Sequence, residues 1–157
     1  QTDTDYLGDK MNLSKNFSLL ELTKSQTAER KGIDNTPNAD QIFNLRNLAE
    51  NILQPVRDEW GSFIVSSGFR SVALCEAIGS KATSQHAKGE AADFEVAGVD
   101  NYKLASWIEA NLPFDQLILE CYTGGNTGWI HCSYVPNGRG DTLTYDRQNG
   151  YRKGLLS

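Results

Sequence analysis

The chain contains few of the residues that mark several common protein classes. Its 157 residues include two histidines, one methionine and three cysteines, and the odd cysteine count argues against a disulfide framework. Its longest apolar stretches are about five residues, whereas a membrane-spanning helix needs roughly 20, so we expect no membrane span. No apolar signal-peptide core opens the sequence.

Positive charge is also scarce. The 15 Lys and Arg residues are outnumbered by 20 Asp and Glu residues, which gives a net charge of −5, and they form no basic run. Proteins that bind nucleic acid normally show clustered Lys and Arg, so the sequence argues against a nucleic-acid partner. An anionic small molecule or peptide is still compatible with this charge, because one well-placed arginine can bind it.

The length and the absence of internal repeats predict one domain. Residues 1–10 are polar and show no hydrophobic periodicity, so we interpret them as a tail, a linker or residues left by cloning. Residues 11–157 form the predicted domain, which we expect to be a monomer.

The hydrophobic pattern predicts helices first and strands last. Ser18 and Glu21 have the spacing of a capping box, and an amphipathic helix is predicted over 39–59, with Pro55 expected to kink it or to start a new turn. The other predicted elements are a strand at 63–65, a helix at 72–78 ended by Gly79, a strand at 90–96, a helix at 101–110, and strands at 116–122, 129–135 and 142–145. This order indicates an α+β fold in which N-terminal helices pack on a small antiparallel sheet.

Both histidines and one aspartate form the most informative set of residues. His86 precedes Asp93 by seven positions, and His131 lies on a later predicted strand. Two neutral imidazoles and one carboxylate are a typical ligand set for catalytic zinc, whose fourth position stays open. The spacing alone is a weak signal, because a histidine on a strand is more often a core residue than a ligand.

Short motifs surround these residues in a fixed order. They are SSGFRS at 66–71, S-x-H-x-x-G-x-A-x-D at 84–93 and WIHCS at 129–133, with LSKNFSLLELT at 13–23, GIDNTP at 32–37, LQPVR at 53–57 and FDQLI at 114–118. In this order they resemble the zinc murein peptidases, the D-Ala-D-Ala carboxypeptidases and phage L-alanyl-D-glutamate endopeptidases, and most of all the phage-type branch. The resemblance covers about residues 11–145 and implies a single domain of the DD-peptidase or hedgehog-like type.

The resemblance also implies roles for individual residues. His86, Asp93 and His131 would bind Zn²⁺, and Arg70 would hold a carboxylate or carbonyl group of the substrate in the cleft. Three further residues are candidates for substrate binding: Ser66, Gln85 and Trp129. Gln85 has a second interpretation, as a residue that orients the metal ligands, and Trp129 is equally well explained as packing.

The general base is expected to be Glu120. Related enzymes carry an acidic residue shortly before the last zinc histidine, and Glu120 lies eleven positions before His131, across a glycine-rich segment that can form a hairpin turn. Some relatives carry their acid three positions before that histidine, where this chain has Gly128. Asp115 and Glu95 are weaker catalytic candidates.

The cysteines are not expected to bind the metal. Cys132 follows His131 directly, so on a regular strand its thiol points to the opposite face. Cys121 and Cys132 flank the same predicted hairpin, and a disulfide between them is an alternative for an oxidising environment.

Together these features predict a zinc metallopeptidase that hydrolyses peptide bonds in peptidoglycan stem peptides. The phage-like pattern favours an L-Ala-D-Glu endopeptidase over a D-Ala-D-Ala carboxypeptidase, and both remain open. Such an enzyme would be made in the cytoplasm of a bacterial or phage-infected cell and would act on the cell wall. The alternative is a catalytically silent module of the same fold that binds the cell wall or forms part of a virion.

Overall fold

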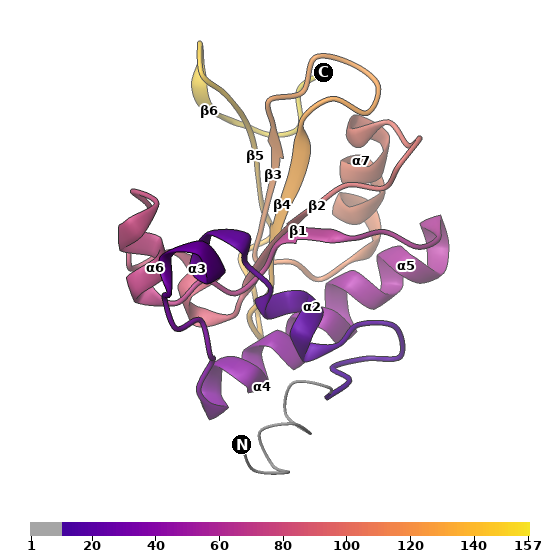
Figure 1. Cartoon of the computed structure of the whole chain (residues 1–157). Helices are drawn as coiled ribbons and strands as arrows, with labels where there is room; N and C mark the ends of the chain where they lie inside the picture. Colours follow the sequence, from indigo (N-terminus) through magenta and orange to yellow (C-terminus); the bar gives the residue numbers. More distant parts are fainter. Residues whose placement is uncertain (1–10) are drawn as a thin grey trace.

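The structure is a computed structural model that describes residues 11–157, so the predicted tail at 1–10 lies outside the described residues (Figure 1). The helices are α2 (Leu19–Thr23), α3 (Gln26–Lys31), α4 (Ala39–Leu48), the π-helical turn η1 (Ala49–Leu53), α5 (Gln54–Trp60), α6 (Val72–Ala77), the 3-10 turn η2 (Gln85–Lys88) and α7 (Asn101–Asn111). The strands are β1 (Val65–Ser67), β2 (Ala91–Phe94), β3 (Gln116–Glu120), β4 (Trp129–Ser133), β5 (Asp141–Asp146) and β6 (Gly150–Lys153). No helix within residues 11–157 is long and apolar enough to cross a membrane.

The N-terminal helices begin where their caps predict. The Ser18 hydroxyl accepts a hydrogen bond from the Glu21 amide, and the Glu21 carboxylate accepts one from the Ser18 amide, which confirms the capping box. Asn38 and Gln41 form a second capping box at the start of α4. Each cap satisfies backbone N–H groups that the first helical turn leaves without a partner.

The predicted helix at 39–59 is interrupted just before Pro55. Proline has no N–H to donate to the carbonyl four residues earlier, and the chain forms the wider turn η1 before restarting as α5, with Pro55 in its first turn. The apolar face stays continuous through the interruption: Leu48, Ile52 and Val56 are all fully buried.

The six strands form one sheet in the order β1-β2-β4-β3-β5-β6. The α+β class with N-terminal helices is confirmed, but the sheet is not purely antiparallel, because β3 and β5 run parallel. The hairpin partner β4 occupies one edge of β3, so the chain crosses over and adds β5 on the other edge in the same direction. Strand β6, which pairs with β5, was not predicted from the sequence.

The first strand lies two residues later than predicted. Phe63 sits outside β1 with its ring near those of Phe17 and Phe94, at centroid distances of 5.3 and 5.2 Å. Ile64 is 84% exposed, so the apolar triplet at 63–65 is not a buried strand. The strand begins at Val65 and pairs with β2.

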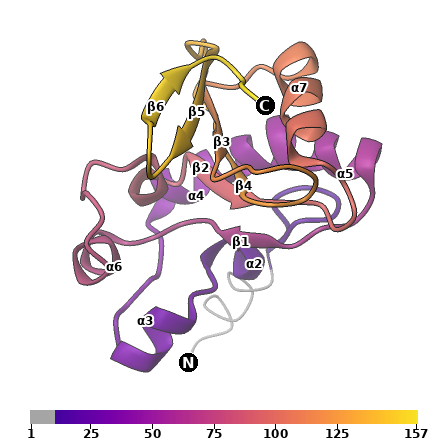
Figure 2. The ribbon, with the colours of Figure 1, turned by 90° about the horizontal axis from the view of Figure 1, so that it is seen from above.

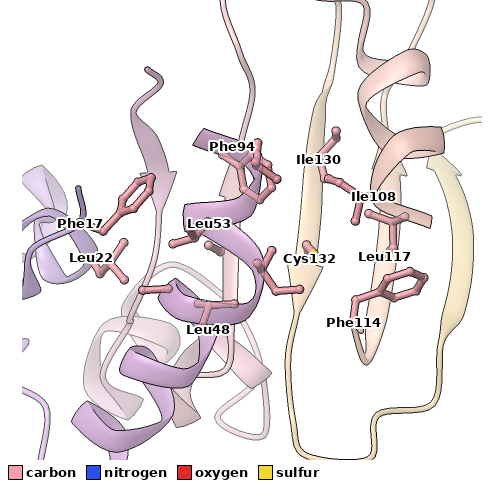
Figure 3. Close-up of a cluster of buried hydrophobic side chains, with 14 of the residues drawn as sticks. Phe17, Leu22, Leu48, Leu53, Phe94, Ile108, Phe114, Leu117, Ile130 and Cys132 are labelled. Carbon is pink, nitrogen blue, oxygen red and sulfur yellow. The ribbon is translucent and has the colours of Figure 1, made fainter. Parts of the chain in front are cut away.

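The two faces of the sheet have different roles. Figures 1 and 2 show α5 and α7 together on one side of the strands, and α3 and α6 on the other. The face toward α5 and α7 carries the apolar side chains that alternate along the central strands, among them Phe94, Leu117, Leu119, Ile130 and Cys132. Figure 3 shows Phe94, Leu117, Ile130 and Cys132 in one apolar cluster with Leu53 and Ile108 from the helices. The opposite face is therefore free to carry polar residues.

An ion pair between the buried Asp115 and the exposed Arg139 holds the start of β3. Asp115 accepts two hydrogen bonds from the Arg139 guanidinium, at 3.0 and 2.9 Å, and one from the Gln85 amide at 2.9 Å. The hydrogen bonds of Arg139 hold the pKa of Asp115 at about 2, against the opposing effect of burial. Gln85 belongs to η2, so the same carboxylate ties this turn to the sheet.

We predict that this pair gives the fold a specific sensitivity to acid. The pKa of Asp115 is lower in the folded chain than the usual value of about 4, so its ionisation stabilises the fold above that pH. This contribution is lost as the pH falls from about 4 to about 2. Asp115→Asn should lower the free energy of unfolding at pH 7 by about 1–3 kcal/mol, as measured by urea denaturation. This difference from wild type should shrink as the pH falls from about 4 to about 2. Glu59→Gln, which alters an exposed carboxylate on α5, is the control and should not change the urea midpoint at pH 7.

Candidate metal centre and active site

The three candidate ligands come from three elements that the fold brings together. Asp93 on β2 and His131 on β4 are direct partners across the antiparallel ladder. His86 lies on η2, where the Ser84 hydroxyl accepts a hydrogen bond from the His86 amide. Gly89 ends this turn at φ +76°, and a Cβ there would collide with the Gln41 carbonyl of α4. The glycine is what lets the histidine turn pack against the helix.

The donor atoms are spaced as a metal site requires. Asp93 Oδ1 lies 3.4 Å from His86 Nε2 and 3.0 Å from His131 Nδ1. One ligand atom from each residue lies within 4.8 Å of the other two. Ligands bound at about 2.0–2.1 Å in a tetrahedron are roughly 3.3 Å apart, so the residues fit a four-coordinate zinc ion with one position left for another ligand.

The protonation of these residues also suits a metal. The Gly68 carbonyl lies 2.7 Å from His86 Nδ1, so this nitrogen donates its hydrogen and Nε2 is left to coordinate. Burial opposes the ionisation of Asp93, but its contacts with His131 and His86 outweigh this effect and keep the pKa of the carboxyl well below its usual range. Asp93 is therefore an anion at neutral pH.

The donors open into a cavity of about 610 Å³ on the polar face of the sheet. Arg70, Gln85, Glu120 and Trp129 line this cavity. Tyr151 of β6 lines it as well and is 62% exposed. Tyr151 was not among the predicted site residues, because no strand was predicted there and no motif marks it.

Glu120 faces the metal ligands from the neighbouring strand. It pairs with Trp129, and two positions along the same ladder Ile118 pairs with His131, so all four side chains lie on one face. The Trp129 indole donates a 3.0 Å hydrogen bond to Glu120 Oε2. Burial, followed by the nearby Asp93 charge, raises the pKa of Glu120, and this makes it a better proton acceptor than an exposed glutamate.

Gly128 has no room for the acid that some relatives carry there. Its φ is +69°, and a Cβ at this position would overlap the Glu120 carbonyl oxygen and the Cys121 backbone. The hairpin thus excludes a side chain at 128 and sets Glu120 beside the cavity instead.

Other predicted residues lie elsewhere or have other contacts. Ser66 does not line this cavity, and its hydroxyl donates to the Asp93 backbone carbonyl at 3.0 Å. The side-chain amide of Gln85 donates hydrogen bonds to Asp115 and Glu90, and these bonds orient η2. The two weaker candidates for the base, Asp115 and Glu95, do not line the cavity. Asp115 is paired with Arg139, as described above.

The cysteines are not ligands in this arrangement. Cys132 is buried in the apolar core on the opposite face from His131, as predicted (Figure 3). A disulfide with Cys121 is wrong, because Cys132 pairs with Leu117 and Cys121 lies four residues farther along. That offset is about 13 Å along a strand, whereas a disulfide needs Cα atoms within about 7 Å.

Comparison with known proteins agrees with this geometry. The sequence model of the Peptidase M15 family matches residues 15–133. The chain belongs to the peptidase M15 family. The matched range contains His86, Asp93, His131 and Glu120, and it ends before β5 and β6. None of the curated proteins matches the chain. Family membership supports a hydrolase of the metallopeptidase class.

We predict that substitutions of two adjacent residues on β4 have opposite effects on metal binding. His131→Ala should lose tight zinc binding, because it removes one of three donors, whereas Cys132→Ala should keep one zinc per chain. Zinc content after dialysis, measured by mass spectrometry, checks both variants. Equal zinc loss in folded Cys132→Ala, or full retention in His131→Ala, would contradict the ligand assignment.

Proposed function

We propose that this protein is a zinc-dependent peptidase that hydrolyses peptide bonds in peptidoglycan stem peptides. The observation that carries the proposal is the placement of Glu120 on the same sheet face as the His86, Asp93 and His131 donor set, within one cavity. Family membership supports a metallopeptidase, and the phage-like motifs of the sequence favour an endopeptidase that cuts between L-Ala and D-Glu.

Zinc, held by His86, Asp93 and His131, would supply a Lewis acid that polarises the scissile carbonyl and lowers the pKa of water. The protein residues supply the rest. Glu120 takes a proton from the attacking water and delivers it to the leaving amine, a role that suits a carboxylate of raised pKa. Arg70 faces the same cavity and binds a carboxylate or the developing oxyanion of the substrate. Trp129 holds Glu120 in place through its indole hydrogen bond.

A silent wall-binding or virion module is the competing function, because Gly128 lacks the acid found in some relatives. The position of Glu120 favours the enzyme. Purified peptidoglycan incubated with the zinc-loaded protein should release muropeptides whose new termini identify the bond, and a chelator should stop the release. Glu120→Gln should keep zinc but lose turnover by about two to four orders of magnitude.

Two results would count against this function. Release of no chelator-sensitive product by the wild type would favour the silent module. Turnover by Glu120→Gln at near the wild-type rate, with zinc bound, would show that another group is the base.

The pH dependence gives a separate test of the pair Glu120 and Trp129. The indole hydrogen bond stabilises the ionised carboxylate and lowers its pKa, so Trp129→Phe should raise that pKa. A base must be deprotonated, and the acid limb of kcat/KM should therefore move to higher pH in Trp129→Phe. Rates from pH 4 to 9 on a soluble stem peptide measure this shift. An unchanged acid limb in an active Trp129→Phe variant would show that the acid limb does not report the ionisation of Glu120.

A further inference from the structure

We propose that a cationic groove next to the metal centre binds a carboxylate on the stem peptide two residues from the cleaved bond, and so selects peptides with diaminopimelate rather than lysine as their third residue. This inference rests on the proposed function and names its substrate class. Diaminopimelate is lysine with one additional carboxylate at the end of its side chain, so the two peptides differ in a single negative charge.

The groove has a volume of about 640 Å³ and lies between the start of α3 and the end of α6. Its floor is β1 and the residues on either side of it. Its lining includes Glu21, Lys24, Arg30, Ile64, Ser66 and Arg70. Figures 1 and 2 show α3 and α6 on the same side of the sheet, opposite α5 and α7.

The groove and the cavity at the metal centre share one lining residue, Arg70. The Arg70 amide donates to the carbonyl of the ligand His86 at 3.1 Å, so its backbone is fixed to the site. Its Nε is buried and has no hydrogen-bond partner within residues 11–157. An unpartnered guanidinium nitrogen is costly unless a ligand satisfies it, and a peptide that passes from one cavity to the other would lie beside it.

The floor of the groove suits an extended peptide. Strand β1 is the outermost strand of the sheet, and it pairs with β2 alone. An exposed strand edge can take an added strand by backbone hydrogen bonding. Ile64 is 84% exposed beside it and offers apolar contact. The Ser66 hydroxyl bonds the Asp93 carbonyl, which ties this edge to the strand that carries a metal ligand.

The positive charge of the groove favours an anionic ligand. Lys24, Arg30 and Arg70 form no ion pair with another described residue. The one acidic residue in the lining, Glu21, is engaged by the capping box of α2. A cationic groove is unusual on a chain of net charge −5, and it is complementary to an anionic peptide.

The test uses two soluble stem peptides, L-Ala-γ-D-Glu-X-D-Ala-D-Ala with X as meso-diaminopimelate or L-Lys. Wild type should prefer the diaminopimelate peptide by about tenfold in kcat/KM, and Arg30→Glu should remove that preference mainly through KM. Lys31→Glu is the matched control, since it makes the same charge change on the same helix outside the groove, and it should keep the preference.

Binding of both peptides to zinc-loaded Glu120→Gln, measured by calorimetry, gives the same comparison without turnover. In this background, Arg30→Glu should abolish the preference for diaminopimelate and Lys31→Glu should retain it. This result supports the groove even if the wild type cuts no bond, and in that case only the proposed activity fails. Equal binding of the two peptides, or the same loss in Lys31→Glu as in Arg30→Glu, overturns the groove while leaving the activity intact.

Discussion

The pairing of Asp93 with His131 across β2 and β4 is the contact on which the site depends. Side chains alternate along a strand, so a slip of one residue would turn Asp93 into the core and bring Phe94 or Ala92 to the polar face. Phe94 and Ala92 are both fully buried, and the free energy of burying them fixes the register. The apolar core therefore decides which atoms meet on the opposite face, where Asp93 Oδ1 and His131 Nδ1 come within 3.0 Å of each other.

The third candidate ligand, His86, is placed by close backbone contacts. The Gly68 carbonyl orients His86, and a Cβ at Gly68 would overlap the Leu22 carbonyl at the end of α2. The same region carries Arg70, whose amide bonds the His86 carbonyl. The SSGFRS motif thus joins an N-terminal helix, the histidine turn and the cationic side chain, and glycine is required where the backbones touch.

The sequence was most informative where local chemistry decides the structure. Capping at Ser18, the break before Pro55 and the opposite directions of His131 and Cys132 follow from hydrogen bonding, a missing N–H and strand alternation. Prediction failed where a distant partner decides. Ile64 is exposed because the neighbouring Phe63 finds aromatic partners, and β5 is parallel because β4 already occupies one edge of β3. Tyr151 reaches the cavity through that same crossover, so no local pattern could have marked it.

The absence of an acid at position 128 and the placement of Glu120 beside the cavity have the same structural cause. The tight return of the hairpin brings the backbone of 128 against the Glu120 carbonyl, which removes space for a side chain there. The same return sets Trp129 opposite Glu120 and supplies the indole that holds the carboxylate. Both histidines of the chain belong to the donor set, and the carboxylates that line the described cavity are Asp93 and Glu120. With Asp93 assigned to the metal, Glu120 is the other carboxylate that lines this cavity, and this is the reason for proposing it as the general base.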